Sequence, residues 1–264
     1  MTLRFGILGS CFLLLIGGVG YTLWRLTPPV SALQGPFVEV VRWIPPAGRQ
    51  VVQVGPASPN WVKSENISKH TLYAILVAED ARFYEHGALD WRETFLSFRK
   101  NWEEGKIVRG GSTITQQVVR IVFLSQEKRY LRKVREALGA IALEFLLSKD
   151  EILAWYLNLV EFGKGAYGIQ EAAQRHFHTS PDLLTVSESI HLALVLPSPH
   201  LWSKGLQKKD LTEFGQKRFQ MILDRLRENA YITAEQWRNV RATGNFGSPL
   251  DGVVPVSESA SEGF

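Results

Sequence analysis

An uncharged run near the N-terminus constrains this chain more than any other feature of its sequence. Phe5 to Trp24 spans 20 residues without a charge, bracketed by Arg4 and Arg25. As an α-helix, such a run rises about 30 Å, the hydrocarbon thickness of a bilayer. Buried core helices rarely stay apolar for so long, so the run predicts a retained membrane anchor over residues 1–26. A cleaved signal peptide is the alternative, because small residues at 17–20 lie near a candidate cut site.

Length and composition set broad limits on the rest of the chain. With 264 residues it can bury a substantial core, in one domain or in one domain with a small satellite. The net charge of +4 suits an anionic membrane surface or a phosphorylated substrate. The sequence has no dense run of Lys and Arg, so nucleic acid is not expected as a partner. Cys11 is the only cysteine, which excludes an intramolecular disulfide and, beyond the N-terminal run, a cysteine nucleophile.

The remaining sequence divides into three parts. Residues 27–67 are rich in proline and predict a juxtamembrane connector with short extended pieces. Helical patterns begin near Ser68 and continue to about residue 246. No strand pattern of any length competes, so the fold is predicted to be mainly α. Residues 247–264 hold few apolar residues and predict a disordered tail. Helices are expected at 91–102, 129–147, 169–177, 187–196 and 211–229, and after the capping sequences that start at Ser148 and Thr233.

The segment from Arg109 to Arg120 reads Arg-Gly-Gly-Ser-Thr-Ile-Thr-Gln-Gln-Val-Val-Arg. Its glycine pair permits backbone angles that are closed to other residues. Thr113 followed three residues later by Gln116 predicts a capping box and hence a helix start. A helix start presents free N–H groups and a positive dipole end, which suit an anion such as phosphate. An ordinary junction between loop and helix, with solvated polar side chains, is the alternative.

Two further segments carry acidic residues in unusual settings. Glu79 and Asp80 follow an apolar helical stretch, where carboxylates are costly unless they are paired, bound to metal or functional. Glu136 lies one turn after Arg132 in the helix predicted at 129–147. That pair is expected on the polar face, where spacing alone favours an ordinary intrahelical salt bridge. The core face of the same helix is predicted to carry Val134, Leu138, Ile141 and Phe145.

Four separated segments together resemble the peptidoglycan glycosyltransferases, which occur alone or as the polymerising half of class A penicillin-binding proteins. A lone Arg-Lys-x-x-Glu has no weight, but four such segments in the family's order are specific. The resemblance covers most of the chain from Ser68 to Gln236. The segments are Glu79-Asp-Ala-Arg-Phe-Tyr-Glu-His86 through Asp90, Gly110 to Gln117, Arg132-Lys-x-x-Glu136, and Tyr156-Leu-Asn158 followed by Gly163, Gly165, Tyr167 and Gly168.

The resemblance implies a fold and an activity. It implies a lysozyme-like helical glycosyltransferase domain over residues 68–246, with two lobes around a cleft, behind one N-terminal transmembrane helix. Family members polymerise lipid II, a disaccharide-pentapeptide carried on undecaprenyl pyrophosphate, into β-1,4-linked glycan. The donor's anomeric centre is inverted and the lipid pyrophosphate leaves. The substrates would be lipid II and the growing lipid-linked glycan, at the outer side of the bacterial cytoplasmic (inner) membrane, with other cell-wall synthesis or division proteins as further partners.

The resemblance also implies roles for individual residues. Glu79 would be the general base for the acceptor hydroxyl, and Glu136 the second acid, near the donor pyrophosphate. This sequence departs from the family at Arg120, where lysine is usual, and at Ile121, where asparagine is usual. Residues implied in substrate binding or in support of the site are Asp80, His86, Ser112, Thr113, Gln116, Gln117, Arg120, Arg132, Lys133 and Asn158.

Alternative functions and one cofactor question stay open at the level of the sequence. A lysozyme-like lytic transglycosylase or hydrolase would share a helical core with a catalytic glutamate, but it typically lacks a phosphate-binding cluster. A non-catalytic scaffold disagrees with the intact glutamates, and a fused transpeptidase disagrees with the missing Lys-Thr-Gly. No cofactor is required with certainty. Glu79, Asp80 and Glu136 are the residues that could help to hold Mg²⁺ or Mn²⁺.

Overall fold

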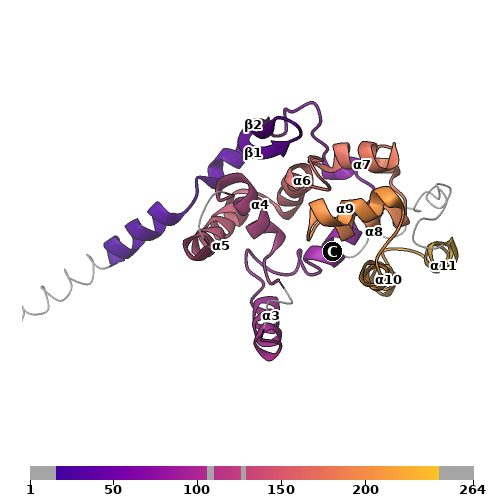
Figure 1. The fold of residues 1–264 in the computed structure, drawn as a ribbon. Helices are drawn as coiled ribbons and strands as arrows, with labels where there is room; N and C mark the ends of the chain where they lie inside the picture. Colours follow the sequence, from indigo (N-terminus) through magenta and orange to yellow (C-terminus); the bar gives the residue numbers. More distant parts are fainter. Residues whose placement is uncertain (1–15, 106–109, 126–128, 244–264) are drawn as a thin grey trace, which may run out of the picture. The chain divides into compact units, whose positions relative to one another are not determined.

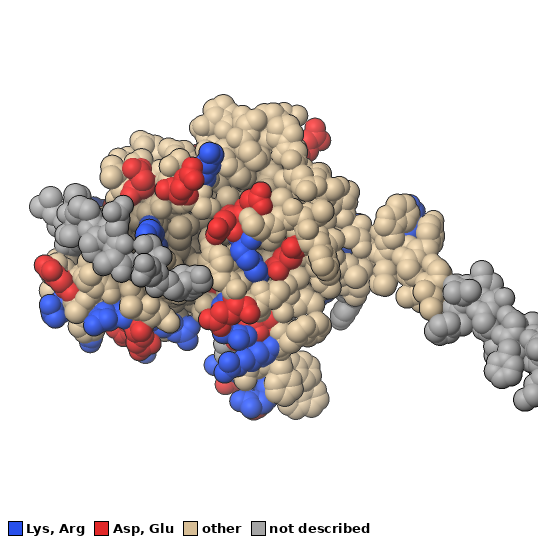
Figure 2. All heavy atoms as spheres, turned by 180° about the vertical axis from the view of Figure 1, so that it is seen from behind, with Lys and Arg blue, Asp and Glu red and all other residues tan. Residues whose placement is uncertain are grey.

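The computed structural model describes residues 16–105, 110–125 and 129–243, and it is mainly helical, as predicted (Figure 1). The first part of the predicted anchor, Arg109 and the predicted tail at 247–264 lie outside the described residues. Among the helices that are described, none is both long enough and apolar enough to cross a bilayer. Figure 2 shows Lys and Arg side chains interspersed with Asp and Glu on one face of the described surface, in keeping with the small net charge.

The helices follow the predicted order. Residues 16–26 are helical, and the helices whose ranges were predicted have bounds within two residues of the prediction. Helix α9 was not predicted. The elements are η1 (Val30–Gln34), β1 (Val38–Ile44), β2 (Gly48–Val54), η2 (Ser64–Asn66), α2 (Lys69–Glu79), α3 (Trp91–Glu103), α4 (Ile114–Phe123), α5 (Arg129–Leu146), α6 (Lys149–Leu159), α7 (Ile169–Phe177), η3 (Pro181–Leu183), α8 (Val186–Val195), α9 (Pro199–Lys208), α10 (Glu213–Glu228) and α11 (Ala234–Thr243).

The chain forms two compact units, each assembled from separated stretches. The first unit consists of Met1–Val41, Val51–Ala57 and Tyr84–Tyr156, and the second of Arg42–Gln50, Ser58–Phe83 and Leu157–Phe264. The two lobes predicted within residues 68–246, the lysozyme-like character and the cleft stay predictions, because both units also include part of the chain before residue 68. The stretch predicted as a connector contributes to both units, because its β-hairpin begins and ends in the first and turns in the second.

In the first unit, the segment after the N-terminal helix packs directly on α5 and α6. The Arg135 Nε donates to the carbonyl oxygen of Leu26 at 2.9 Å. The Trp155 Nε1 donates to the carbonyl oxygen of Leu33 at 3.1 Å. Gly139 lies against Pro28, whose ring would be 3.2 Å from a Cβ added to the glycine. This part of the predicted connector is therefore fixed to the unit by side chains and by close packing.

The predicted core face of α5 is wrong. Phe145 is 85% exposed, Val134 49% and Ile141 42%. The buried face instead carries Glu136 and, one and two turns further on, Ala140 and Leu143. Small residues on this face let α5 approach its neighbours closely, and such contact is what dense packing requires. The Arg132–Glu136 pair therefore belongs to the inner side of the helix and not to a solvated face.

Helix α3 also turns its apolar side outward. The side chain that it buries is that of Ser97, which lies with Thr94 against Gly111. An added Cβ on this glycine would lie 3.2 Å from Thr94 Cα and 3.3 Å from Ser97 Cβ. The exposed residues at helical spacing are Trp91 (72%), Phe95 (65%), Phe98 (64%) and Trp102 (79%).

Helix α8 is the centre of the second unit. Almost all of its residues are buried, as expected for a helix that is apolar on most sides. It packs against α2, α9, α10 and α11. Thr185 and Glu188 form a capping box, which defines where the helix begins.

The β-hairpin is a second correction to the sequence analysis. No strand of appreciable length was predicted, yet β1 and β2 have 7 residues each. Buried and exposed residues alternate only at the start of β1, so the periodic signal is short. The hairpin buries Val38, Val40 and Val54, and this burial stabilises strands that the local sequence specifies weakly.

The second unit buries histidine side chains. Burial lowers the pKa of His191 from 6.5 to about 4, although a hydrogen bond with the Ser187 carbonyl group opposes the shift. The His191 ring lies 5.0 Å from that of Phe219. Burial also lowers the pKa of His70 and His176. Each of these rings is therefore more difficult to protonate in the folded protein than in the unfolded chain.

We predict that Gly139→Ala lowers the free energy of unfolding by about 1–3 kcal/mol, the range for overpacking a core. The added Cβ would lie 2.6 Å from Val119 Cγ1. Urea denaturation of the full chain in detergent, followed by tryptophan fluorescence, measures the change. In the double variant with Val119→Ala the clash is relieved, so the two effects should be less than additive. A gain in stability, as at an open helix position, would contradict this packing.

We predict that acid weakens the second unit between pH 6.5 and pH 4. The unfolded chain binds a proton at His191 in this range while the folded protein does not, so stability falls as the pH falls. The loss from His191 should approach about 3 kcal/mol at pH 4. Denaturation at a series of pH values measures it. His191→Asn keeps a donor for the Ser187 carbonyl group and should make the free energy of unfolding less dependent on pH. An unchanged dependence on pH would show that His191 is not its cause.

Candidate functional site

The first turn of α4 is built as predicted. The Gln116 backbone N–H donates to Thr113 Oγ1 at 3.2 Å, and the Thr113 N–H donates to Gln116 Oε1 at 3.1 Å. The Thr113 hydroxyl donates in turn to the Ala88 carbonyl oxygen at 2.8 Å. Thr113 and Gln116 are both buried, so these polar groups serve the helix start itself. They fix the position of a helix N-terminus, whose positive dipole end favours an anion.

The glycine that directly precedes Ser112 has a different use from the one expected. Gly111 does not adopt a positive φ. It instead permits the close approach of α3, because its missing side chain leaves room for Thr94 and Ser97. The Ser97 hydroxyl donates to the Gly110 carbonyl oxygen at 3.3 Å. The loop that carries Ser112 can therefore pack closely against α3, because Gly111 has no side chain. A weak hydrogen bond also joins this loop to α3.

Glu136 is the most unusual charged residue of the first unit, because its side chain is only 2% exposed. Its Oε2 accepts from Lys133 Nζ at 2.8 Å. Its Oε1 lies 3.2 Å from Arg132 Nε, but the two atoms are not aligned, and neither has a hydrogen-bond partner among the described residues. An isolated buried carboxylate would be very costly, so the two cations are what compensate for the burial of Glu136.

Lys133 joins this cluster to the start of α4. Its Nζ donates to Ser112 Oγ at 2.7 Å as well as to Glu136. The Lys133 side chain is 52% exposed and that of Arg132 28%, so both cations reach the surface. Two positive groups and one carboxylate leave the cluster with an excess of positive charge. Together with the helix N-terminus, this excess suits a phosphate group.

Other predicted residues of the first unit lie on these elements or in the segment before α3. Gln117 and Arg120 are half-buried on α4. His86 lies in the segment before α3, and its Nδ1 is 2.5 Å from the Gly87 carbonyl oxygen. The structure thus brings together four predicted residues around the capped start of α4, and their contact with substrate stays a prediction. They are Ser112, Arg132, Lys133 and Glu136.

In the second unit, Glu79 and Asp80 end a buried helix, as predicted. Glu79 is the last residue of α2 and is half-buried, and Asp80 is the C-cap and is buried. The end of α2 carries the negative pole of the helix dipole, which does not favour a second negative charge. The role of Glu79 as a general base stays a prediction.

Asn158 has a structural role that the sequence did not indicate. Its Oδ1 accepts from the Val62 N–H at 2.9 Å, and its Nδ2 donates to the Val62 carbonyl oxygen at 2.8 Å. The side chain thus pairs with a backbone in the manner of a neighbouring strand. The Asn158 carbonyl oxygen accepts from Arg42 at 2.9 Å. These contacts join the end of α6 to segments far away in the sequence, while a role of Asn158 in substrate binding stays a prediction.

Arg42 and Trp43 are the residues of this region that the sequence analysis missed. Burial lowers the pKa of Arg42 to about 10, so the guanidinium stays protonated at neutral pH. It lies 4.8 Å from the centre of the Tyr167 ring. The Tyr167 hydroxyl accepts from the Trp43 N–H at 3.0 Å. Both residues fall in the proline-rich stretch, where local sequence gave no signal of a distant partner.

The three predicted metal ligands come from both units, Glu136 from the first and Glu79 and Asp80 from the second. No group of three or more His, Cys, Asp or Glu side chains within the described ranges could hold an ion. The carboxylate of Glu136, one of the three predicted ligands, already faces Lys133 and Arg132. Mg²⁺ and Mn²⁺ prefer several oxygen ligands. Binding of such an ion stays a prediction, and no step of the reaction is assigned to one.

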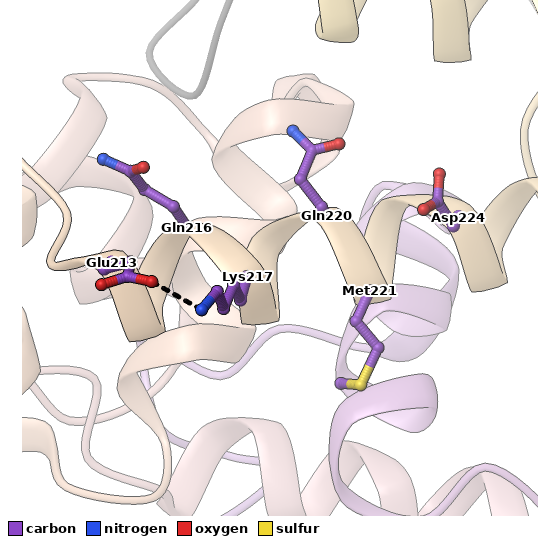
Figure 3. Close-up of a pocket in the computed structure, with 6 residues that line it drawn as sticks. All are labelled: Glu213, Gln216, Lys217, Gln220, Met221 and Asp224. Carbon is purple, nitrogen blue, oxygen red and sulfur yellow. Dashed lines mark hydrogen bonds and ion pairs between the residues drawn. The ribbon is translucent and has the colours of Figure 1, made fainter.

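One hollow elsewhere on the second unit has a volume of about 570 Å³. Side chains of α10 alone line it, and they point to both sides of the helix (Figure 3). An ion pair joins Glu213 and Lys217, and Asp224 accepts from Trp237 Nε1 at 2.8 Å. These contacts are those of an ordinary polar surface. The lining residues are Glu213, Gln216, Lys217, Gln220, Met221 and Asp224.

A family model described as transglycosylase matches residues 47–227, which is more than half of the chain. The chain belongs to the transglycosylase family. The match begins within the β-hairpin, so it includes part of the stretch predicted as a connector. The resemblance to the peptidoglycan glycosyltransferases is thereby confirmed.

Curated relatives of this transglycosylase carry the name biosynthetic peptidoglycan transglycosylase. One from Methylobacillus flagellatus is 39% identical over 151 residues, which cover 57% of this chain and 66% of the relative. One from Cupriavidus metallidurans is 41% identical over 149 residues, covering 56% and 64%. One from Dechloromonas aromatica is 38% identical over 163 residues, covering 62% and 71%. The chain thus spans about two thirds of the length of the relatives that it matches.

We predict that Asn158→Ala lowers the free energy of unfolding by about 1–3 kcal/mol, because it leaves the Val62 N–H and carbonyl group without these partners. Asn158→Asp should cost more, since the new oxygen would face the Val62 carbonyl oxygen. Asn229→Ala, which removes an exposed hydrogen bond to Arg225, is the control and should cost less. Urea denaturation measures all three. If Asn158→Ala kept full stability but lost activity, the residue would act on substrate and not on the fold.

Proposed function

We propose that this protein polymerises lipid II into β-1,4-linked peptidoglycan glycan, as the name of its relatives suggests. The observation that carries the proposal is the buried Glu136, held by Arg132 and Lys133 beside the capped start of α4. This cluster combines an excess positive charge with a helix N-terminus, which is what a pyrophosphate leaving group needs. Family membership supplies the reaction type, and the cluster supplies a place for the donor's phosphates.

On the acceptor side, Glu79 is the proposed general base. The 4-hydroxyl of the incoming unit is a weak nucleophile at neutral pH, so its proton must be removed as it attacks. Glu79 takes this proton while the oxygen forms a bond to the donor's anomeric carbon. A single displacement inverts that carbon and converts the α-linked pyrophosphate into a β-linked glycan. Asp80, next to Glu79 and buried, supports the position of the base.

On the donor side, the bond from the anomeric carbon to the pyrophosphate oxygen breaks, and negative charge develops on the leaving group. Arg132 and Lys133 are proposed to stabilise this charge, with Ser112 and the first N–H groups of α4 as hydrogen-bond donors. Glu136 then acts mainly on the two cations, whose positions it fixes. Gln117 and Arg120, half-buried on the same helix, are proposed to bind the donor's phosphates and sugar.

We place the reaction at the outer surface of the cytoplasmic membrane, because both substrates carry lipid tails. The uncharged run from Phe5 to Trp24 supports an anchor there. The outward aromatic face of α3 and the exposed apolar residues of α5 support contact with lipid, since such faces in water would promote aggregation. Other proteins of cell-wall synthesis or division are proposed as partners.

Incubation with two different substrates distinguishes a polymerising enzyme from one that cleaves glycan. The full chain in detergent is incubated with lipid II or with finished peptidoglycan, and the products are separated by size. Polymerisation predicts long glycan from lipid II and no fragments from finished wall, and a lytic enzyme predicts the reverse. Parallel reactions with chelator, Mg²⁺ or Mn²⁺ test the metal. Full activity in chelator would exclude a requirement for it.

We predict that Glu79→Gln lowers the rate of lipid II polymerisation by at least about 10²-fold, the lower range for losing a general base. The free energy of unfolding should change little, because glutamine has nearly the same shape. Glu65→Gln, which alters a glutamate with a 71% exposed side chain in the same unit, is the control and should keep full activity. Normal polymerisation by Glu79→Gln would remove Glu79 from this role.

A further inference from the structure

A second carboxylate, Glu144, lies two turns after Glu136 on the inner side of α5. Its side chain is 16% exposed, and the fully buried Ala140 and Leu143 lie between the two glutamates in the sequence. Nothing in the sequence distinguished Glu144 from the other polar residues of this helix. Its hydrogen bonds with two other helices of the first unit do distinguish it.

The first contact is with α4. The Thr115 hydroxyl donates to Glu144 Oε1 at 2.7 Å. Thr115 is fully buried in the first turn of this helix, so its hydroxyl needs an internal acceptor. Glu144 supplies that acceptor, and this bond holds the first turn of α4 to α5.

The second contact is with α6. Lys149 Nζ donates to the same Glu144 Oε1 at 2.7 Å. Lys149 has a side chain that is 22% exposed, so the pair is partly shielded from water. The other oxygen, Oε2, lies beside Gly87, 4.0 Å from where a Cβ would be. The charge of Glu144 is thus balanced by one lysine, in contrast to the excess positive charge around Glu136.

The start of α4 is consequently held from two directions. Thr113 donates to the Ala88 carbonyl oxygen, which fixes the helix cap to the segment before α3. Thr115 donates to Glu144, which fixes the first turn to α5. Ser112 precedes this turn directly and is held by Lys133. A change in the Thr115–Glu144 bond would therefore displace the helix N-terminus relative to the cations of α5.

We propose that Glu144 is a positioning residue for the donor site. It acts through Thr115: the carboxylate fixes the first turn of α4, and with it the N–H groups and Ser112 that face the donor's pyrophosphate. Lys149 holds the carboxylate in place and balances its charge. The identity of the ligand rests on the proposed function. The hydrogen bond that joins Glu144 to α4 is independent of that function.

The experiment compares Glu144→Ala, Glu144→Gln and Thr115→Val in the full chain. Steady-state polymerisation of lipid II in detergent gives KM and kcat. Glu144→Ala and Thr115→Val should each raise KM about tenfold, the effect of losing one hydrogen bond to a charged group. The double variant should be no worse than either single variant, because both remove the same bond. Glu144→Gln keeps an oxygen for Thr115 and should restore KM to within about twofold of the wild type.

Three outcomes would overturn the inference. Independent effects that multiply in the double variant would mean that Glu144 does not act through Thr115. A lower melting temperature with unchanged KM and kcat would make the residue merely structural. Failure of Glu144→Gln to restore KM would show that the charge, and not the hydrogen bond to Thr115, is what matters.

A second measurement separates this inference from the proposed function. Hydrogen exchange of the peptide that covers residues 112–118 reports the stability of the first turn without any substrate. It should become faster in Glu144→Ala and stay near the wild type in Glu144→Gln. If the wild type does not polymerise lipid II but these rates change as expected, the proposed function fails and the link to α4 stands. If the rates do not change, the inference fails whatever the activity.

Discussion

The burial of Glu136 is the constraint on which the rest of the first unit depends. A carboxylate that is only 2% exposed must be accompanied by cations, and Lys133 and Arg132 accompany it from the same helix. One of its oxygens accepts a hydrogen bond from Lys133, while the other lies near Arg132 without the geometry of a hydrogen bond. The charge of Glu136 is therefore compensated, but its hydrogen bonding among the described residues is incomplete. This combination contributes little stability. What it provides is two cations whose positions are fixed before any anion arrives, so that their reorganisation costs little during the proposed reaction.

How much of the site could be predicted from the sequence depended on the distance between partners along the chain. The partners in the capping box of Thr113 and Gln116, and those among residues 132, 133 and 136, are at most four positions apart, so spacing alone predicted these pairs. The bonds from Ser112 to Lys133 and from Thr115 to Glu144 span 21 and 29 residues. No periodicity encodes such a pair, because it depends on how α4 and α5 pack. The same reason explains why the structural role of Asn158 was missed, since its side chain pairs with the backbone of Val62, 96 residues away.

The fold was predicted well where helices have strong local signals and poorly where burial decides. Helix order and bounds followed from periodicity, caps and prolines. The buried face of α5 did not, because the usual rule assumes that the larger apolar stripe avoids water. That assumption does not hold for a helix whose outer side is proposed to face lipid: Phe145 can point outward, while Gly139 and Ala140 provide the close approach that the interior requires. The hairpin was missed for a related reason, since its strands are stabilised by burial of Val40 and Val54 and not by a long alternating pattern.

Helix α5 positions three features: the charged cluster, the carboxylate of Glu144 and the contact with the N-terminal segment. Their spacing follows from helix geometry. Glu136 and Glu144 are eight residues apart, so about 12 Å of helix separates the charged cluster from the residue that fixes the start of α4. Arg135, one residue before Glu136, donates to the carbonyl oxygen of Leu26, where the N-terminal helix ends. Any tilt of α5 would therefore move the cations, the helix start and the attachment of the N-terminal segment together. Because these parts share one helix, the packing that orders the charged cluster also fixes the segment after the N-terminal helix.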